Sequence, residues 1–229
     1  MIFTVYVPNN KGLRYVRDRG LITLPPPSRG WPQYVLQEER GEEIPERVYK
    51  SKELSFGITG EDLVNECLLA KDPTVMAASK TSIPLNLSWL GSYADSIFGL
   101  PTLCVLGKGG MGFEEFKKAY GNSLTRKTTP NFQQKRVVIP GRYERLIRSL
   151  VQQDDVEYIS LEGKVDVTAA TDSSIDYAID IVLSGKTCIR EGLGIFATLF
   201  KSDGVLVYNR FSPLQNLINY GALTQEDKP

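Results

Sequence analysis

Two aspartates and the short loop after them are the residues best suited to chemistry. Asp176 and Asp180 are four positions apart, and the loop consists of Ser184, Gly185, Lys186 and Thr187. If residues 175–183 form a helix, both carboxylates share one face, where like charges repel unless a cation or hydroxyl groups satisfy them. The loop adds two hydroxyl groups, a lysine and a permissive backbone, which suit a phosphate monoester. The segment predicts a sugar-phosphate site, while an exposed helix face and a surface turn remain the alternative.

Two other glycine-containing patterns are weaker candidates. The loop resembles the end of a P-loop, but that motif needs a glycine where Asp180 stands. Residues 107–112 match the G-x-G-x-x-G pattern of a dinucleotide-binding turn, between an expected strand and an expected helix. The acid that should follow about 20 residues later is absent, because Lys127 stands there. We therefore expect a flexible loop at 107–112, with a dinucleotide site as the alternative.

The composition excludes several kinds of site. The 229 residues include no histidine and only three scattered cysteines, so imidazole-based triads and four-cysteine zinc sites cannot form. The 27 basic and 27 acidic residues balance, which argues against a nucleic-acid or anionic-membrane binder held by bulk electrostatics. The odd number of cysteines and the short apolar start, ending at Pro8, predict a soluble cytoplasmic protein.

Strands alternating with helices must position these residues, which predicts an α/β fold with largely parallel sheets in two lobes. The expected strands cover residues 2–7, 34–36, 54–60, 102–106, 136–139, 156–161, 165–167, 195–200 and 205–208. The expected helices cover residues 13–19, 61–69, 113–120, 143–152, 175–183 and 214–220, and another helix opens at 42–45. Four prolines mark residues 24–33 as an extended loop.

The run from Asp176 to Leu193 resembles the phosphoribosyl-diphosphate signature of the ATP phosphoribosyltransferase family. That signature has an acid, three residues, a second acid, a hydroxyl-Gly-x-Thr loop and a later Gly-Leu. Upstream, the residues ending at Asp166 are similar to the family's Gly-x-Val-Glu segment. Segments beginning at Pro8, Arg40 and Phe56 resemble its Pro-Asn-Lys-Gly-Arg, Arg-x-x-Asp-Ile-Pro and Gly-Ile-Thr-Gly-x-Asp-Leu patterns, in the same order. Four collinear segments are more specific than any one motif.

The resemblance implies a two-lobed fold of the periplasmic-binding-protein type II kind, with the site in the cleft between the lobes. It implies a Mg²⁺-dependent transfer of phosphoribosyl from phosphoribosyl diphosphate to N1 of ATP, releasing pyrophosphate, as the first step of histidine biosynthesis. The chain resembles the short form without a C-terminal regulatory domain. Such a form works as a homo-oligomer or with a separate regulatory subunit similar to histidyl-tRNA synthetase.

The family pattern also implies roles for individual residues. Asp166 and Asp180 are expected to be catalytic at the ribose, with the loop at 184–187 on the donor's 5-phosphate. The other expected substrate-binding residues are Asp176, Lys11, Arg14, Arg40, Thr59 and Gly60. Gly and Pro near residues 99 and 212 suggest the crossings between lobes. Residues 1–99 with 212–229 then form the nucleotide side, and 100–211 form the donor side.

Two departures from the family pattern leave other functions open. Leu13 stands where the family has arginine, with Arg14 one place later. Residues 138–143 replace the family's Ala-Thr-x-Tyr-Pro-Asn turn. The alternatives are a diverged phosphoribosyltransferase that acts on another base and a non-catalytic two-lobed module that binds small anions.

Overall fold

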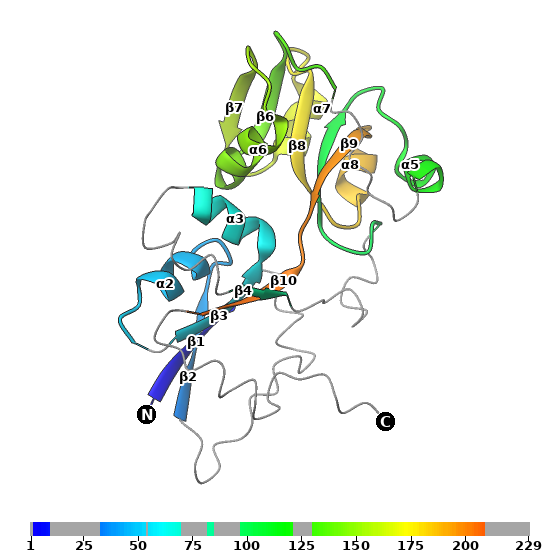
Figure 1. Ribbon diagram of the computed structural model, residues 1–229. Coiled ribbons are helices and arrows are strands. Elements are labelled where there is room, and N and C mark those ends of the chain that lie inside the picture. Colours follow the sequence, from blue (N-terminus) through cyan, green and yellow to red (C-terminus); the bar gives the residue numbers. More distant parts are fainter. Residues whose placement is uncertain are drawn as a thin grey trace. The chain divides into compact units, whose positions relative to one another are not determined.

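The computed structural model describes residues 2–9, 33–53, 55–69, 82–84, 97–120 and 130–208. The chain divides into two compact units, each with its own sheet (Figure 1). Unit 1 comprises Met1–Leu85 with Gly204–Pro229, and unit 2 comprises Asn86–Asp203. Within the described ranges, no helix is long and apolar enough to cross a membrane.

The sheet of unit 1 has the strand order β2-β1-β3-β10-β4. Its strands are β1 (Ile2–Pro8), β2 (Gln33–Glu39), β3 (Ser55–Gly60), β4 (Ser82–Pro84) and β10 (Gly204–Tyr208). β1 is parallel to β2 and β3, whereas β10 is antiparallel to β3 and β4. Helices α2 (Ile44–Lys50) and α3 (Glu61–Leu69) pack their apolar residues with those of β10. The core of unit 1 includes Ile44, Val48, Val64, Val205 and Val207.

The sheet of unit 2 repeats this topology in the order β7-β6-β8-β5-β9. Its strands are β5 (Thr102–Gly107), β6 (Arg136–Pro140), β7 (Glu157–Leu161), β8 (Tyr177–Val182) and β9 (Gly194–Lys201). β6 is parallel to β7 and β8, and β5 is antiparallel to β8 and β9. Each unit thus has three parallel strands followed by one antiparallel strand from the other half of the chain.

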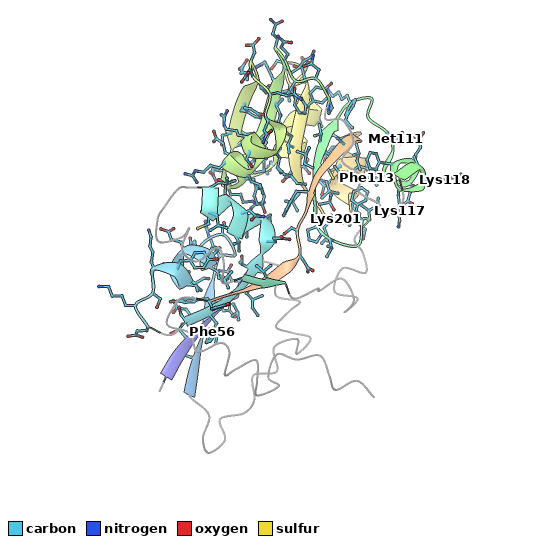
Figure 2. The ribbon with its side chains drawn as sticks, in the orientation of Figure 1. Phe56, Met111, Phe113, Lys117, Lys118 and Lys201 are labelled. Atoms are coloured by element: carbon cyan, nitrogen blue, oxygen red, sulfur yellow. The ribbon has the colours of Figure 1, made fainter. Side chains whose placement is uncertain are left out.

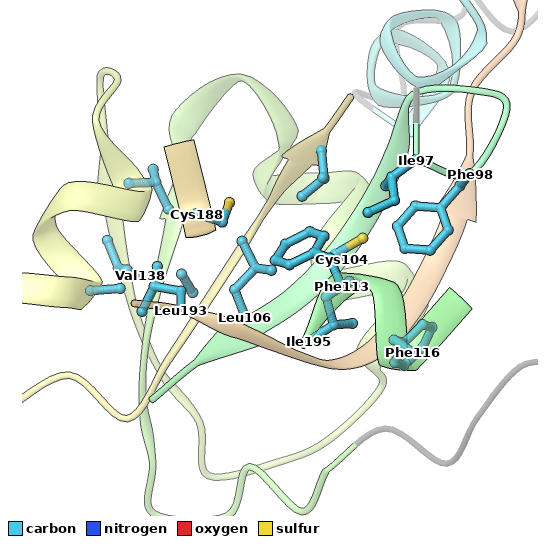
Figure 3. Packing of buried hydrophobic residues seen from close by; sticks show 14 residues of the cluster. Ile97, Phe98, Cys104, Leu106, Phe113, Phe116, Val138, Cys188, Leu193 and Ile195 are labelled. Carbon is cyan, nitrogen blue, oxygen red and sulfur yellow. The ribbon is translucent and has the colours of Figure 1, made fainter. Parts of the chain in front are cut away.

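Helices cover the sheet of unit 2. They are α5 (Phe113–Tyr120), a 3-10 turn (Gly141–Tyr143) leading into α6 (Glu144–Val151), α7 (Val165–Thr171) and α8 (Lys186–Arg190). Figure 3 shows the buried cluster, in which Phe113 and Phe116 of α5 pack with Leu106 of β5 and Ile195 of β9. On the outer face of α5, Lys117 and Lys118 are exposed (Figure 2). Apolar burial against the sheet therefore decides how α5 is oriented.

The secondary structure predicted for two segments of unit 2 is wrong. Residues 175–183 are not a helix but contain the strand β8, with both faces of its middle covered. A mostly apolar run of this kind, interrupted only by Asp180, is typical of a buried parallel strand, and its apolar spacing also fits a helix. Residues 165–167 are not a strand but the first turn of α7. The sheets are also mixed rather than largely parallel, because β5 and β10 run against their neighbours.

The unit boundaries also differ from the expected ones. β10 was expected in the second lobe, but it pairs with β3 of unit 1. Ile97 and Phe98 were expected in the first lobe, but they belong to the apolar core of unit 2. The expected helices at 13–19 and 214–220 lie outside the described residues, as does the proline loop except for Gln33, which begins β2.

Candidate functional site

The candidate site of unit 2 lies where its three parallel strands end. Because β6, β7 and β8 run in the same direction, their carboxyl ends meet at one edge of the sheet. Open α/β sheets bind ligands at this edge, which we call the carboxyl edge. The segments that leave the three strands there are 141–143, 162–166 and 183–187.

Asp180 and Asp166 come together near this edge from two elements. Asp180 lies on β8 and pairs with Cys104 of β5, while Asp166 lies in the first turn of α7, which packs on β8. The Ile181 backbone N–H donates to Asp180 Oδ1 at 2.7 Å, and the Val167 N–H donates to Asp166 Oδ1 at 2.9 Å. Backbone hydrogen bonds therefore hold both carboxylates in place.

Burial raises the pKa of Asp180 to about 6. The hydrogen bond from Ile181 and the charge of Arg142 oppose this rise, and the negative charge of Asp166 adds to it. Burial and a neighbouring carboxylate both disfavour the ionised form. The pair therefore gains from any bound group that offers positive charge or hydrogen-bond donors.

The loop at 184–187 is shaped by glycine and backed by an aromatic ring. Gly185 has a φ of +67°, and a Cβ at this position would lie 2.7 Å from the ring of Phe113. Only glycine fits such a left-handed position against a buried ring. Lys186 then begins α8 and is exposed, and Thr187 is partly exposed. The loop thus offers a lysine, a threonine hydroxyl and backbone groups at the carboxyl edge.

Asp176 does not belong to this group, contrary to the sequence-based expectation. It lies just before β8, at the opposite edge of the sheet, because four residues of strand span about 13 Å rather than one helical turn. Its carboxylate accepts hydrogen bonds from Lys135 Nζ at 3.0 Å and from the Arg136 backbone N–H at 2.9 Å. Burial alone would raise the pKa of Asp176. The hydrogen bonds and charges of Arg136 and Lys135 together lower it by more, so the pKa lies below its usual value. Asp176 therefore links the starts of β6 and β8.

The glycine-rich segment 107–112 packs against β9 and lies away from Asp166 and Asp180. Met111 and Ile195 exchange backbone hydrogen bonds of 3.0 and 2.8 Å, which extends the pairing along β9. A Cβ on Gly107 would lie 3.1 Å from the Asp176 carbonyl oxygen, so the segment is at the edge opposite the loop at 184–187. The expected flexible loop is therefore a turn followed by one paired residue, Met111, and it shares no edge with the phosphate-binding candidates.

Two residues near the carboxylates were not predicted as part of the site. Arg142 follows β6 directly and is exposed, and its charge acts on Asp180. Its position just after a buried parallel strand was the available signal. Cys188 on α8 is buried, and burial with the charges of Asp166 and Asp180 raises its pKa to about 12. A thiol with this pKa is not a nucleophile at neutral pH, so cysteine chemistry is unsuited to this edge.

Of the expected substrate-binding residues of unit 1, three lie at the corresponding edge of its sheet, namely Arg40, Thr59 and Gly60. Arg40 follows β2 and is exposed, whereas Thr59 and Gly60 end β3, from which α3 continues directly. The Thr59 hydroxyl is fully buried and donates to the Gly41 carbonyl at 2.7 Å. Thr59 thus holds the turn after Arg40 through its own side chain. Lys11 and Arg14 lie outside the described residues.

We predict that Thr59→Val lowers the free energy of unfolding by about 1–2 kcal/mol, because the buried Gly41 carbonyl loses its donor. Thr59→Ser keeps the hydroxyl and is the matched control, with a smaller loss. Urea unfolding followed by circular dichroism measures both. A loss in Thr59→Ser but none in Thr59→Val would show that the methyl group, rather than the hydrogen bond, stabilises this turn.

The described residues contain no group of three or more His, Cys, Asp or Glu side chains placed to hold a metal ion. Mg²⁺ is often held by one or two carboxylates together with substrate phosphates, rather than by a complete protein cage. Asp166 and Asp180 are oxygen ligands whose mutual repulsion a divalent cation would relieve. The two carboxylates therefore fit a Mg²⁺ ion that enters with a phosphorylated substrate.

The fold is one that binding proteins and a transferase share. The Escherichia coli periplasmic aliphatic sulphonate binding protein SsuA matches with a TM-score of 0.53 at 10% identity, covering 96% of this chain and 69% of its own. The Bordetella pertussis BvgS periplasmic VFT2 domain matches with a TM-score of 0.51 at 10% identity, covering 99% and 88%. These likenesses identify the class as the periplasmic-binding-protein type II-like α/β fold.

The family model of ATP phosphoribosyltransferase matches residues 40–223, so the chain belongs to this family of phosphoribosyl-transferring enzymes. The ATP phosphoribosyl transferase (HisG:HisZ) complex of Thermotoga maritima is similar in structure, with a TM-score of 0.58 at 15% identity, covering 97% of this chain and 96% of that one. A search of curated proteins finds no significant match.

Proposed function

We propose that this protein transfers phosphoribosyl from phosphoribosyl diphosphate to N1 of ATP and releases pyrophosphate, the first step of histidine biosynthesis. The observation that supports this most is the convergence of Asp166, Asp180 and the loop at 184–187 near one sheet edge of unit 2. The match to the ATP phosphoribosyltransferase family supports the same reaction.

The proposed reaction needs positioning and charge more than acid–base chemistry. The bond from the ribose C1 to the pyrophosphate oxygen breaks, the adenine N1 forms the new bond to C1, and positive charge develops at the ribose between these events. Carboxylates near the ribose stabilise that charge, and donors on the phosphates hold the leaving group. In this proposal Asp180 and Asp166 face the ribose, and the loop at 184–187 holds the 5-phosphate. A protein without histidine can perform such a reaction.

Unit 2 is proposed to bind the donor and unit 1 to bind ATP. On unit 1, Arg40 and Gly60 lie at the ends of parallel strands, and Thr59 positions the turn after Arg40. Lys11 and Arg14 follow β1 in the sequence and are proposed as further cations for the polyphosphates.

Mg²⁺ is the proposed cofactor, with Asp166 and Asp180 as its protein ligands. When bound, it would neutralise the diphosphate and so stabilise the leaving group.

The proposed partners follow from the reaction and from the similar structures. The Thermotoga maritima structure is a complex of two kinds of subunit, which supports a separate regulatory subunit for this chain, with a homo-oligomer as the alternative. The substrates are ATP and phosphoribosyl diphosphate, and the proposed location is the cytoplasm. Neither nucleic acid nor a membrane has a role in the proposed reaction.

We predict that Thr187→Val raises the apparent Michaelis constant for phosphoribosyl diphosphate at least tenfold. The variant keeps the shape of the side chain and loses one charge-assisted hydrogen bond to phosphate, which corresponds to about 1.4 kcal/mol. Thr187→Ser retains the hydroxyl and is the control. Steady-state kinetics of pyrophosphate release measure the constant, and an unchanged value in Thr187→Val would remove the loop from the donor site.

A further inference from the structure

Arg142 differs in its surroundings from three other described arginines of unit 2. Arg136, Arg148 and Arg190 each form an ion pair with a carboxylate. Within the described part of the chain, Arg142 forms no ion pair, and its guanidinium lies 5.1 Å from the ring centre of Tyr143. The side chain is exposed. A guanidinium that rests on an aromatic face keeps its N–H donors available for an anion.

The backbone places Arg142 between the two segments of the candidate donor site. Arg142 follows the carboxyl end of β6, and β6 lies between β7, which leads to Asp166, and β8, which leads to the loop at 184–187. Val138 pairs with Ala178, and continuing this register brings Arg142 level with the end of β8. Neighbouring strands are about 5 Å apart, so the arginine is within reach of a ligand on the loop.

A phosphate group bound at this edge would need a cation beside it, because two carboxylates lie nearby. A phosphate monoester on the loop at 184–187 would bring negative charge close to Asp180 and Asp166. Lys164 and Lys186 are also exposed cations at this edge, but Arg142 follows the strand that lies between β7 and β8. An arginine also offers a planar pair of donors that matches phosphate oxygens.

We propose that Arg142 binds the 5-phosphate of the donor together with the loop at 184–187, as a substrate-binding residue supplied by the turn after β6. This inference rests on the proposed function, because it assigns a further contact within the same donor site. The turn departs in sequence from the family pattern, so Arg142 is a feature of this chain rather than of the signature.

The test is calorimetric titration of ribose 5-phosphate and, separately, of inorganic pyrophosphate into the wild type and its variants. Arg142→Gln should weaken the binding of ribose 5-phosphate at least tenfold and leave that of pyrophosphate within twofold. Arg142→Lys should give an intermediate loss, because it keeps the charge without the paired donors. Arg148→Gln is the matched control, since Arg148 also lies over a tyrosine ring, at 4.4 Å from the centre of Tyr158, but in the last turn of α6.

The outcomes separate this inference from the proposed function. Ribose 5-phosphate binding by Arg142→Gln within twofold of the wild type would overturn the role of Arg142 and leave the reaction standing. A loss confined to pyrophosphate, or an equal loss in Arg148→Gln, would also overturn it. A wild type that neither binds ribose 5-phosphate nor releases pyrophosphate would contradict the proposed function itself. Thermal unfolding confirms that each variant is folded, which we expect because the side chain is exposed.

Discussion

Replacing Asp180 with asparagine is expected to lower the turnover number roughly a hundredfold, because in the proposed reaction its carboxylate stabilises the developing positive charge. The change keeps the shape of a side chain that lies on a central strand of unit 2. Asp176→Asn is the matched control, because Asp176 lies just before the same strand, at the opposite edge of the sheet. That variant should retain turnover within twofold and lose stability, since its ties to Lys135 and Arg136 weaken.

The same substitution should change stability by an amount that depends on pH. The pKa of Asp180 in the folded protein, about 6, lies above the ordinary value of 3.8, so folding takes up a proton between these values. The stabilising contribution of the protonated form is present below pH 3.8 and is lost as the pH rises through 6. The difference corresponds to about 3 kcal/mol at neutral pH. Asp180→Asn should therefore be more stable than the wild type at pH 7.5, with the advantage gone at pH 3.5.

Steady-state kinetics and urea unfolding at these two pH values test the account of Asp180. The carboxylate is expected both to cost stability and to serve catalysis, so the two measurements should change in opposite directions. Full turnover in Asp180→Asn would remove Asp180 from the site. An equal stability difference at both pH values would show that its ionisation does not affect folding.

Gly194→Ala is expected to lower the free energy of unfolding by about 3 kcal/mol, as overpacking does where the backbone itself must move. A Cβ at this position would lie 2.2 Å from the Gly110 carbonyl oxygen, and Gly110 faces Gly194 with the same lack of space. The two glycines permit the backbone contact beside the pairing of Met111 with Ile195.

Gly112→Ala is the matched control for this prediction. A Cβ there meets nothing within 4 Å, and its φ lies outside the left-handed range, so the change should alter stability by less than about 0.5 kcal/mol. Urea unfolding of both variants measures the difference. A Gly194→Ala protein as stable as Gly112→Ala would show that the contact between the two segments is not needed.

The sequence predicted the α/β class and most strands because their apolar runs are short and bounded by turn residues. It did not distinguish the strand β8 from a helix, since Ile175, Ala178, Ile179 and Val182 satisfy a helical period although the strand is covered on both faces. This error placed Asp176 beside Asp180. The motif spacing still made the loop at 184–187 a candidate phosphate site, because a family signature does not depend on the assignment of secondary structure.

Other parts of the candidate site depend on contacts between distant segments. The influence of Asp166 and Arg142 on Asp180 follows from the parallel pairing of β6, β7 and β8, which the sequence does not reveal. The G-x-G-x-x-G pattern was interpreted as a local loop. Position 110 needs a glycine, however, because the backbone of Gly194 on β9 leaves no room for a Cβ there. Such requirements arise from tertiary packing and have no local sequence signal.

The central claim is tested most directly by incubating the protein with phosphoribosyl diphosphate, Mg²⁺ and each of a panel of nucleotides, and measuring pyrophosphate release. Release is expected to depend on ATP, with one phosphoribosyl group joined to N1 of the adenine for each pyrophosphate formed. Release with another nucleotide but not with ATP would contradict the assignment of the acceptor. Binding of phosphoribosyl diphosphate with no release for any nucleotide would contradict the proposed reaction and indicate a binding module.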